Sequence, residues 1–206
     1  MAMIAIDVVL LPPKRVMDKA IALNRLLQRT TPGEIRLSSK PDKTHGLAHL
    51  SVAMGCIESK QLPRIRKQLS QIAKQFDPLQ LSVTGIKIEK RRNGQQIPYF
   101  TIKRTRLLQA LHETLMRSLP RSSCASISSR NFYAKNANPL SVRWVKNYAR
   151  KASFSRFNPH ITLGIGRFHR QPFRFPIHFV ASRLAVCHLG DYCTCRKVLF
   201  SVHLKK

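Results

Sequence analysis

The sequence predicts an α+β fold in which short strands pair mainly as antiparallel hairpins. Two observations indicate this class. Four segments place apolar residues at helical spacing, at residues 16–29, 62–76, 106–119 and 140–152. Between and after them, short apolar or alternating segments follow one another closely and are separated by turn-forming residues, which favours hairpins over a parallel sheet.

The first strand is expected at residues 3–11, where an apolar run is interrupted by Asp7 and ends at Pro12 and Pro13. Proline ends the run because it cannot donate a hydrogen bond to a neighbouring strand. The same reasoning predicts the remaining strands, at residues 46–55, 79–88, 96–103, 159–166, 175–180, 184–189 and 196–204.

Two irregular segments are expected between these elements. Lys90-Arg91-Arg92-Asn93-Gly94 has the composition of a hairpin turn. Residues 120–139 are rich in Ser and Asn and show no clear period, which predicts a long loop or an insertion. A length of 206 residues suits one domain of two lobes, spanning residues 1–206.

The charge of the chain indicates polyanionic partners. Lys and Arg number 37 and Asp and Glu number 9, which gives a formal net charge of +28. Such an excess attracts RNA, DNA, nucleotides and anionic membrane surfaces, although solubility alone can also produce a basic chain. We expect RNA or a nucleotide as the partner, and a monomer.

The cysteines and the apolar runs indicate a cytoplasmic protein. The five cysteines are odd in number and irregularly spaced, which favours reduced thiols over a disulfide framework. The apolar N-terminal stretch lacks a basic leader, so a buried strand explains it better than a signal peptide. No apolar run approaches the length of about 20 residues that crosses a bilayer, and we expect no membrane attachment.

Two segments share the pattern histidine, apolar, hydroxyl, apolar. They are His49-Leu50-Ser51-Val52 and His160-Ile161-Thr162-Leu163. Alternate side chains of a strand point to the same face, so each histidine projects beside its hydroxyl while the apolar residues face the core. If the two strands face each other, both imidazoles and both hydroxyls converge on one groove.

This set of side chains suits the chemistry of a phosphodiester bond. A neutral imidazole can remove a proton from the attacking oxygen, and a protonated imidazole can donate one to the leaving oxygen. The hydroxyls of Ser51 and Thr162 can donate to the non-bridging phosphate oxygens. The scheme needs no metal and no cofactor, and the pattern leaves open which of His49 and His160 is the acid.

A third segment has nearly the same letters and serves as an internal comparison. His112-Glu113-Thr114-Leu115 lies within a helical pattern, where positions i and i+2 point in different directions. We therefore expect no catalytic role for His112.

The paired motifs resemble those of the two-histidine (2H) phosphoesterases. Asn158-Pro159-His160-Ile161-Thr162-Leu163 is similar to the second motif of that family, and His49-Leu50-Ser51-Val52 to the first, with Ser in place of the commoner Thr. The resemblance implies a bilobal, pseudo-twofold α+β fold, with antiparallel-rich sheets lining a central cleft and helices on the outside. It also implies hydrolysis of 2′,3′-cyclic phosphate ends to 2′-phosphates, or reversible 2′-5′ RNA ligation.

Further residues are candidates for substrate contact or for metal binding. They are His45, which shares a strand side with His49, and Arg156, Phe157 and Arg167, which interleave cations with an aromatic ring near the second motif. A basic cluster at Lys87, Lys90, Arg91 and Arg92 is a solvated turn or a surface that steers RNA. Cys187, His188, Cys193 and Cys195 lack the usual zinc spacing and favour a hairpin without metal.

Two alternatives to an RNA phosphodiesterase stay open from the sequence. The first is a non-catalytic basic protein that binds RNA or the ribosome, whose binding would depend on salt but not on the two motif histidines. The second is a 2H enzyme that acts on a small cyclic nucleotide or on an NAD-derived cyclic phosphate.

Overall fold

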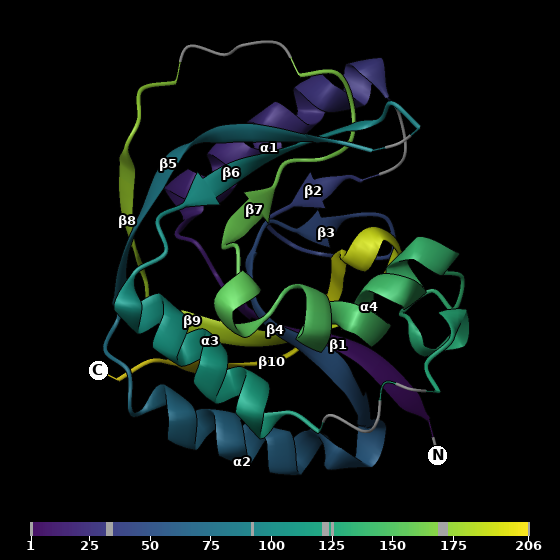
Figure 1. Cartoon of the computed structure of the whole chain (residues 1–206), viewed down its shortest axis with the longest axis vertical. Helices are drawn as coiled ribbons and strands as arrows, with labels where there is room; N and C mark the ends of the chain where they lie inside the picture. Colours follow the sequence, from purple (N-terminus) through teal and green to yellow (C-terminus); the bar gives the residue numbers. More distant parts are fainter. Residues whose placement is uncertain are drawn as a thin grey trace.

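The computed structural model describes residues 2–31, 35–91, 93–120, 124, 126–168 and 173–205. Within them lie two four-stranded antiparallel sheets, a two-stranded parallel pair and the four predicted helices (Figure 1). The α+β class predicted from the sequence is confirmed. Among the described residues, no helix combines the length and the apolar character that crossing a membrane requires.

The first sheet is built from both ends of the chain, in the order β10-β9-β1-β4. Its inner strand β1 is flanked on both sides and is apolar except for one carboxylate, and six of its residues are fully buried. Because both faces of β1 are buried, the N-terminal run is continuously apolar and does not alternate between apolar and polar residues. The strands are β1 (Met3–Leu10), β4 (Leu50–Glu58), β9 (Arg183–Leu189) and β10 (Cys195–His203).

The second sheet comes from the middle of the chain, in the order β7-β6-β5-β8. Burial alternates along β6, with Pro98, Phe100 and Ile102 buried and the residues between them half-buried. One face therefore packs into the core and the other is partly open. The strands are β5 (Leu79–Lys90), β6 (Gln96–Ile102), β7 (His160–Thr162) and β8 (Ile177–Ala181).

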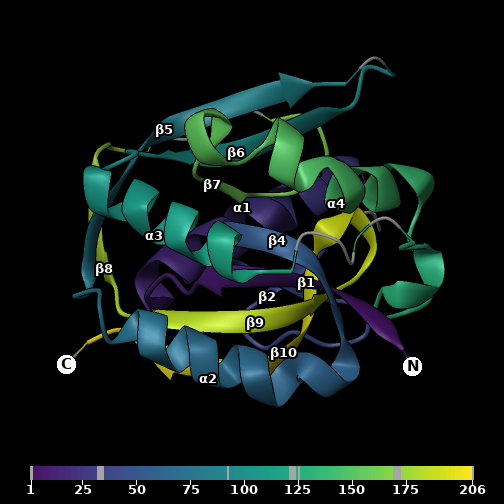
Figure 2. The ribbon, with the colours of Figure 1, turned by 60° about the horizontal axis from the view of Figure 1, so that its bottom comes forward.

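The helices connect the two sheets. The four are α1 (Lys14–Thr30), α2 (Leu62–Ala73), α3 (Arg106–Ser118) and α4 (Pro139–Lys151). Helix α1 follows a strand of the first sheet but bonds to the second half of the chain, through Asn24 Nδ2 and the Leu163 carbonyl oxygen 2.8 Å away. Helices α3 and α4 lie between strands β6 and β7 of the second sheet in the chain but contact β4 of the first (Figure 2).

Side-chain caps explain where α3 and α4 begin. The Thr105 hydroxyl accepts a hydrogen bond from the Leu108 N–H, and the Asn138 side chain accepts one from the Ser141 N–H. Each cap satisfies a backbone donor that the first helical turn leaves without a partner. Pro139 then occupies the first helical position of α4, where a missing N–H costs little.

Two predicted strands differ from the observed ones. The strand expected at 46–55 is divided into β3 (Gly46–Leu47), which pairs with β2 (Leu37–Ser38), and β4. The strand expected at 159–166 ends at Thr162, because the chain turns at Gly164 with φ of +142°. A Cβ at that glycine would lie 2.7 Å from Asn24 Nδ2, so no larger residue fits there.

The segment expected as a loop or insertion contributes to the core in its described part. Ile127 is 2% and Phe132 is 1% exposed, and Ser129–Asn131 form one 3₁₀ turn. In the predicted hairpin turn, the Gly94 N–H donates to the Arg91 carbonyl oxygen at 2.9 Å, and Arg92 lies outside the described residues.

Candidate active site

The two histidine motifs lie on different sheets and are brought together where β4 contacts β7. His49 immediately precedes β4, and His160 is the first residue of β7. The charge of His49 is close enough to lower the pKa of His160. The fold therefore places the two imidazoles in one region of the molecule, although 110 residues lie between them in the sequence.

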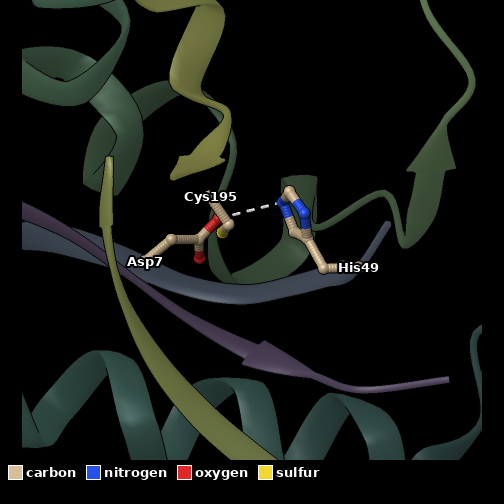
Figure 3. Close-up of side chains that lie close together, drawn as sticks. All are labelled: Asp7, His49 and Cys195. Carbon is tan, nitrogen blue, oxygen red and sulfur yellow. Dashed lines mark ion pairs between the residues drawn. The ribbon is translucent and has the colours of Figure 1, made fainter. Parts of the chain in front are cut away.

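The orientation of His49 is set by its two ring nitrogens. Its Nδ1–H donates to the Leu47 carbonyl oxygen at 2.6 Å, because a carbonyl can only accept. Its Nε2 faces the Asp7 carboxylate, with Nε2 and Oδ2 3.6 Å apart (Figure 3). The backbone bond at Nδ1 thus orients the ring so that Nε2 faces Asp7.

Asp7 is a member of the candidate site that sequence reasoning did not identify. It lies on β1 with 0% exposure, and its Oδ2 accepts a hydrogen bond from the Ser51 hydroxyl at 2.6 Å. Within the described part of the chain, its Oδ1 has no hydrogen-bond partner. Burial raises the pKa of Asp7, while His49 and Ser51 act to lower it.

A β-bulge places Ser51 on the same face as Asp7. Asp7 pairs with Met54, but the register between β1 and β4 shifts by one residue after Val8, so that Val9 pairs with Ser51. Without this extra residue in β4, the alternation of side chains would point Ser51 to the opposite face. The bulge therefore allows Asp7 to contact both polar members of the first motif.

Asp7 also determines the protonation of His49. Burial acts to lower the pKa of His49, but the nearby negative charge of Asp7, together with the backbone bond to Leu47, outweighs burial and raises the pKa above its ordinary value of 6.5. A carboxylate beside an imidazole stabilises the charged form. His49 is accordingly biased towards the imidazolium.

His160 is biased in the other direction. Its Nδ1–H donates to the Asn158 carbonyl oxygen at 2.8 Å, and burial followed by the charge of His49 lowers its pKa below 6.5. The ring centroid of Tyr99 lies 5.0 Å from that of His160. Thr162, two residues along β7, is half-buried like His160, whereas Ile161 between them is fully buried.

Three potential metal ligands lie close together in this region. Donor atoms of Asp7, His49 and Cys195 all lie within 4.8 Å of one another (Figure 3). Burial raises the pKa of Cys195 well above 9.0, so its thiol stays protonated, and Asp7 is already engaged with His49 and Ser51. The chemistry of these donors favours a proton rather than a metal ion between them.

The other predicted contacts occupy different surroundings. His45 bonds to Asp42 and lines a separate hollow of about 460 Å³ beside α1. Arg156 is exposed and donates to the Arg150 carbonyl oxygen at 2.7 Å, and Arg167 is exposed on the segment after β7. The structure places Phe157 in the core, where it is 3% exposed and is not available to a base.

His112 is a core residue, in agreement with its helical pattern. It is fully buried on α3, and its ring stacks on Phe157 with centroids 3.9 Å apart and planes 1° apart. Its Nδ1–H donates to the Val52 carbonyl oxygen at 2.6 Å, and its Nε2 accepts from the Phe154 N–H at 2.8 Å. The Nδ1 bond thus holds α3 against β4, and the Nε2 bond holds it against the 3₁₀ turn Phe154–Arg156.

Comparisons with known proteins give a family match and likenesses of fold. A sequence model described as the 2′-5′ RNA ligase superfamily matches residues 25–172. Among solved structures, TT0787 of Thermus thermophilus is similar over 98% of both chains, with 15% identity and a TM-score of 0.61. E. coli LigT complexed with 3′-AMP is similar over 99% of both chains, with 15% identity and a TM-score of 0.54.

A search of curated proteins returns no match. The structural likenesses show a shared fold, and the family match covers well over half of the chain. The chain therefore belongs to the 2′-5′ RNA ligase superfamily of two-histidine phosphoesterases.

Proposed function

We propose that the protein is an RNA or nucleotide phosphodiesterase that opens 2′,3′-cyclic phosphate ends to 2′-phosphates, or joins such ends through a 2′-5′ bond. The observation that carries the proposal is the opposite bias of the two histidines, with the pKa of His49 raised and that of His160 lowered. One imidazolium and one neutral imidazole are what acid–base catalysis requires at the same pH.

In the proposed reaction His160 is the general base and His49 the general acid. His160 removes a proton from water, or from the 5′-hydroxyl of a second strand, as that oxygen attacks phosphorus. The bond between phosphorus and O3′ breaks, and His49 donates its Nε2 proton to O3′. The 3.6 Å gap between Nε2 and Asp7 Oδ2 is longer than a hydrogen bond, which leaves this proton available to the substrate.

The two hydroxyls have unequal parts in this scheme. Thr162 projects beside His160 on the half-buried face of β7 and is proposed to donate to a non-bridging phosphate oxygen. The Ser51 proton is engaged with Asp7, so Ser51 contacts phosphate only when that bond is exchanged. Its main proposed contribution is to keep the Asp7 carboxylate charged and in place.

The nature of the substrate is supported by charge and by the relatives. A net charge of +28 attracts polyanions, and LigT of E. coli has been crystallised with 3′-AMP and with ATP. We propose that the reaction needs no metal or cofactor and takes place in the cytoplasm, where the five cysteines stay reduced.

Substitution of each histidine tests the proposal. His49→Ala and His160→Ala should each lower kcat/KM for a 2′,3′-cyclic phosphate end by about 10²- to 10⁴-fold. His203→Ala, on the exposed end of β10, is the control and should behave like wild type. Phosphorus NMR of the product distinguishes a 2′-phosphate from a 3′-phosphate. Wild-type rates in both site variants would refute the proposal.

A further inference from the structure

A row of three side chains extends from the second histidine motif across the second sheet. Thr162 on β7 pairs with Tyr99 on β6, and Tyr99 pairs with Lys87 on β5. Directly opposed residues of antiparallel strands project from the same face of the sheet. Thr162, Tyr99 and Lys87 therefore form a continuous row of hydroxyl, aromatic ring and cation.

This row lies on the more exposed face of the second sheet. The opposite face is closed by Phe100, which is fully buried and contacts Phe173 and Phe175 edge to face. Along β6 the side chains on the face of Tyr99 are half-buried, and Lys87 on β5 is exposed. The hairpin of β5 and β6 that carries the row projects at one side of the molecule (Figure 2).

The neighbouring row brings His160 onto the same face. His160 pairs with Thr101, and Thr101 pairs with Gly85. Among the described residues, the Thr101 hydroxyl would be the near neighbour of a Cβ at Gly85, at 3.7 Å. Because glycine has no side chain, the surface of the sheet is low at this position. The ring of Tyr99 lies beside this low surface, with its centroid 5.0 Å from the ring centroid of His160.

The spacing of the row suits one nucleotide. Adjacent strands lie about 4.8 Å apart, so the backbone of β5 is about 10 Å from that of β7. An aromatic ring beside a reacting phosphate is suited to stack on a base, and a lysine is suited to contact a second phosphate. Glu89, two residues beyond Lys87 on the same face, adds a negative charge that acts on His160 and would repel a further phosphate.

We propose that this row is a binding track for the 3′-terminal end of an oligoribonucleotide, an inference that rests on the proposed function. Tyr99 stacks on the base of the terminal nucleoside, whose cyclic phosphate lies between the two histidines. Lys87 contacts the phosphate that joins this nucleoside to the preceding one. A mononucleotide lacks that second phosphate, so the track makes the protein prefer RNA ends to free cyclic nucleotides.

The test compares a 2′,3′-cyclic mononucleotide with a dinucleotide that ends in the same cyclic nucleoside. Lys87→Ala should lower the ratio of kcat/KM for the dinucleotide to that for the mononucleotide by roughly tenfold, the loss of one charge-assisted contact. Tyr99→Ala should lower kcat/KM for both substrates by roughly 5- to 100-fold, because both present the terminal base.

Lys90→Ala is the matched control. Lys90 lies on the same strand and carries the same charge, but it is three residues from Lys87 and so projects from the other face. The ratio should not change in this variant. An equal fall of the ratio in the Lys87 and Lys90 variants would show general charge attraction and no specific contact at Lys87. An unchanged ratio in Lys87→Ala would overturn the proposed binding track.

A binding measurement separates failure of the track from failure of the proposed function. If wild type turns over neither substrate, the proposed reaction is refuted, and the Kd of a dinucleotide 2′-phosphate is then measured by calorimetry. Weaker binding in Lys87→Ala but not in Lys90→Ala supports the track even then. Equal Kd values in all three proteins reject it.

Discussion

The carboxylate of Asp7 lies 3.6 Å from Nε2 of His49 and 2.6 Å from the hydroxyl of Ser51, so one buried acid on β1 contacts both polar residues of the first motif. Strand β1 and the start of β4 thus supply a linked group of three side chains that share protons: Asp7, His49 and Ser51. His160 on the other sheet bonds to a backbone carbonyl through Nδ1, and among the described residues no carboxylate forms an ion pair with it. The asymmetry between the two motifs leads to specific expectations for pH dependence.

Wild-type kcat/KM should show a bell-shaped pH profile. The base His160 must be neutral, so activity rises with pH through a pKa below 6.5, since burial and His49 lower it. The acid His49 must be protonated, so activity falls as the pH passes a pKa above 6.5, since Asp7 raises it. In Asp7→Asn the negative charge is lost, burial of His49 dominates, and the falling limb should move to lower pH.

NMR titration of the His49 ring measures this effect without relying on activity. Its pKa should be lower in Asp7→Asn than in wild type, while Asp18→Asn, which alters an exposed ion pair with Lys14, should leave the pKa unchanged. An unaltered His49 pKa in the Asp7 variant would show that Asp7 has only a structural role.

The hydroxyls of Ser51 and Thr162 should respond differently to removal. Thr162→Val should lower kcat by about 10²-fold at every pH, because a donor to the phosphate is lost. Ser51→Ala removes a hydrogen bond that lowers the pKa of Asp7, so the carboxylate protonates more easily and supports the His49 imidazolium less. Its falling limb should therefore move to lower pH, and identical pH profiles in the two variants would contradict this division of roles.

Removal of metal ions should leave the reaction intact. Dialysis against a chelator is expected not to change kcat/KM, because the proposed scheme uses only protons. Cys195→Ser is the informative variant, since it replaces the third potential ligand beside Asp7 and His49. Loss of activity on chelation, together with loss in Cys195→Ser, would replace the proposed mechanism by a metal-dependent one.

His112→Ala should destabilise the protein rather than impair its chemistry. The change removes a fully buried ring that stacks on Phe157 and bonds through both nitrogens, which should cost roughly 2–5 kcal/mol of unfolding free energy. Urea denaturation measures this cost, and exposed His203→Ala should change stability by no more than about 0.5 kcal/mol. A folded His112→Ala protein with a large loss in kcat would be evidence of a catalytic role.

The helices and the two histidine motifs could be predicted from the sequence because their signals are local. Helical spacing at 16–29 corresponds to α1, and the same periodicity correctly separated His112 from the two motifs. The division at Ala48 and His49 could not be predicted, since it depends on the pairing of Gly46 with Leu37. Two-residue strands leave no periodic pattern.

Asp7 could not be assigned to the site because its contacts depend on strand neighbours and on one bulge. Its only signal was a carboxylate within an otherwise apolar strand, and 41 residues lie between it and His49. Phe157 presents the reverse case. Beside Arg156 it resembled a surface aromatic, but its ring is buried against a helix that ends almost 40 residues earlier. In both cases the surroundings of the side chain are set by tertiary contacts, which the local sequence does not show.

The exchange of helices between the two sheets has a consequence for folding. Helix α1 follows β1 of the first sheet and bonds to Leu163, while α3 and α4 lie between β6 and β7 of the second sheet and contact β4. Neither half of the chain contains all the elements that cover its own strands. The halves should therefore unfold together in one cooperative transition, and a fragment of residues 79–181 expressed alone should stay largely unfolded.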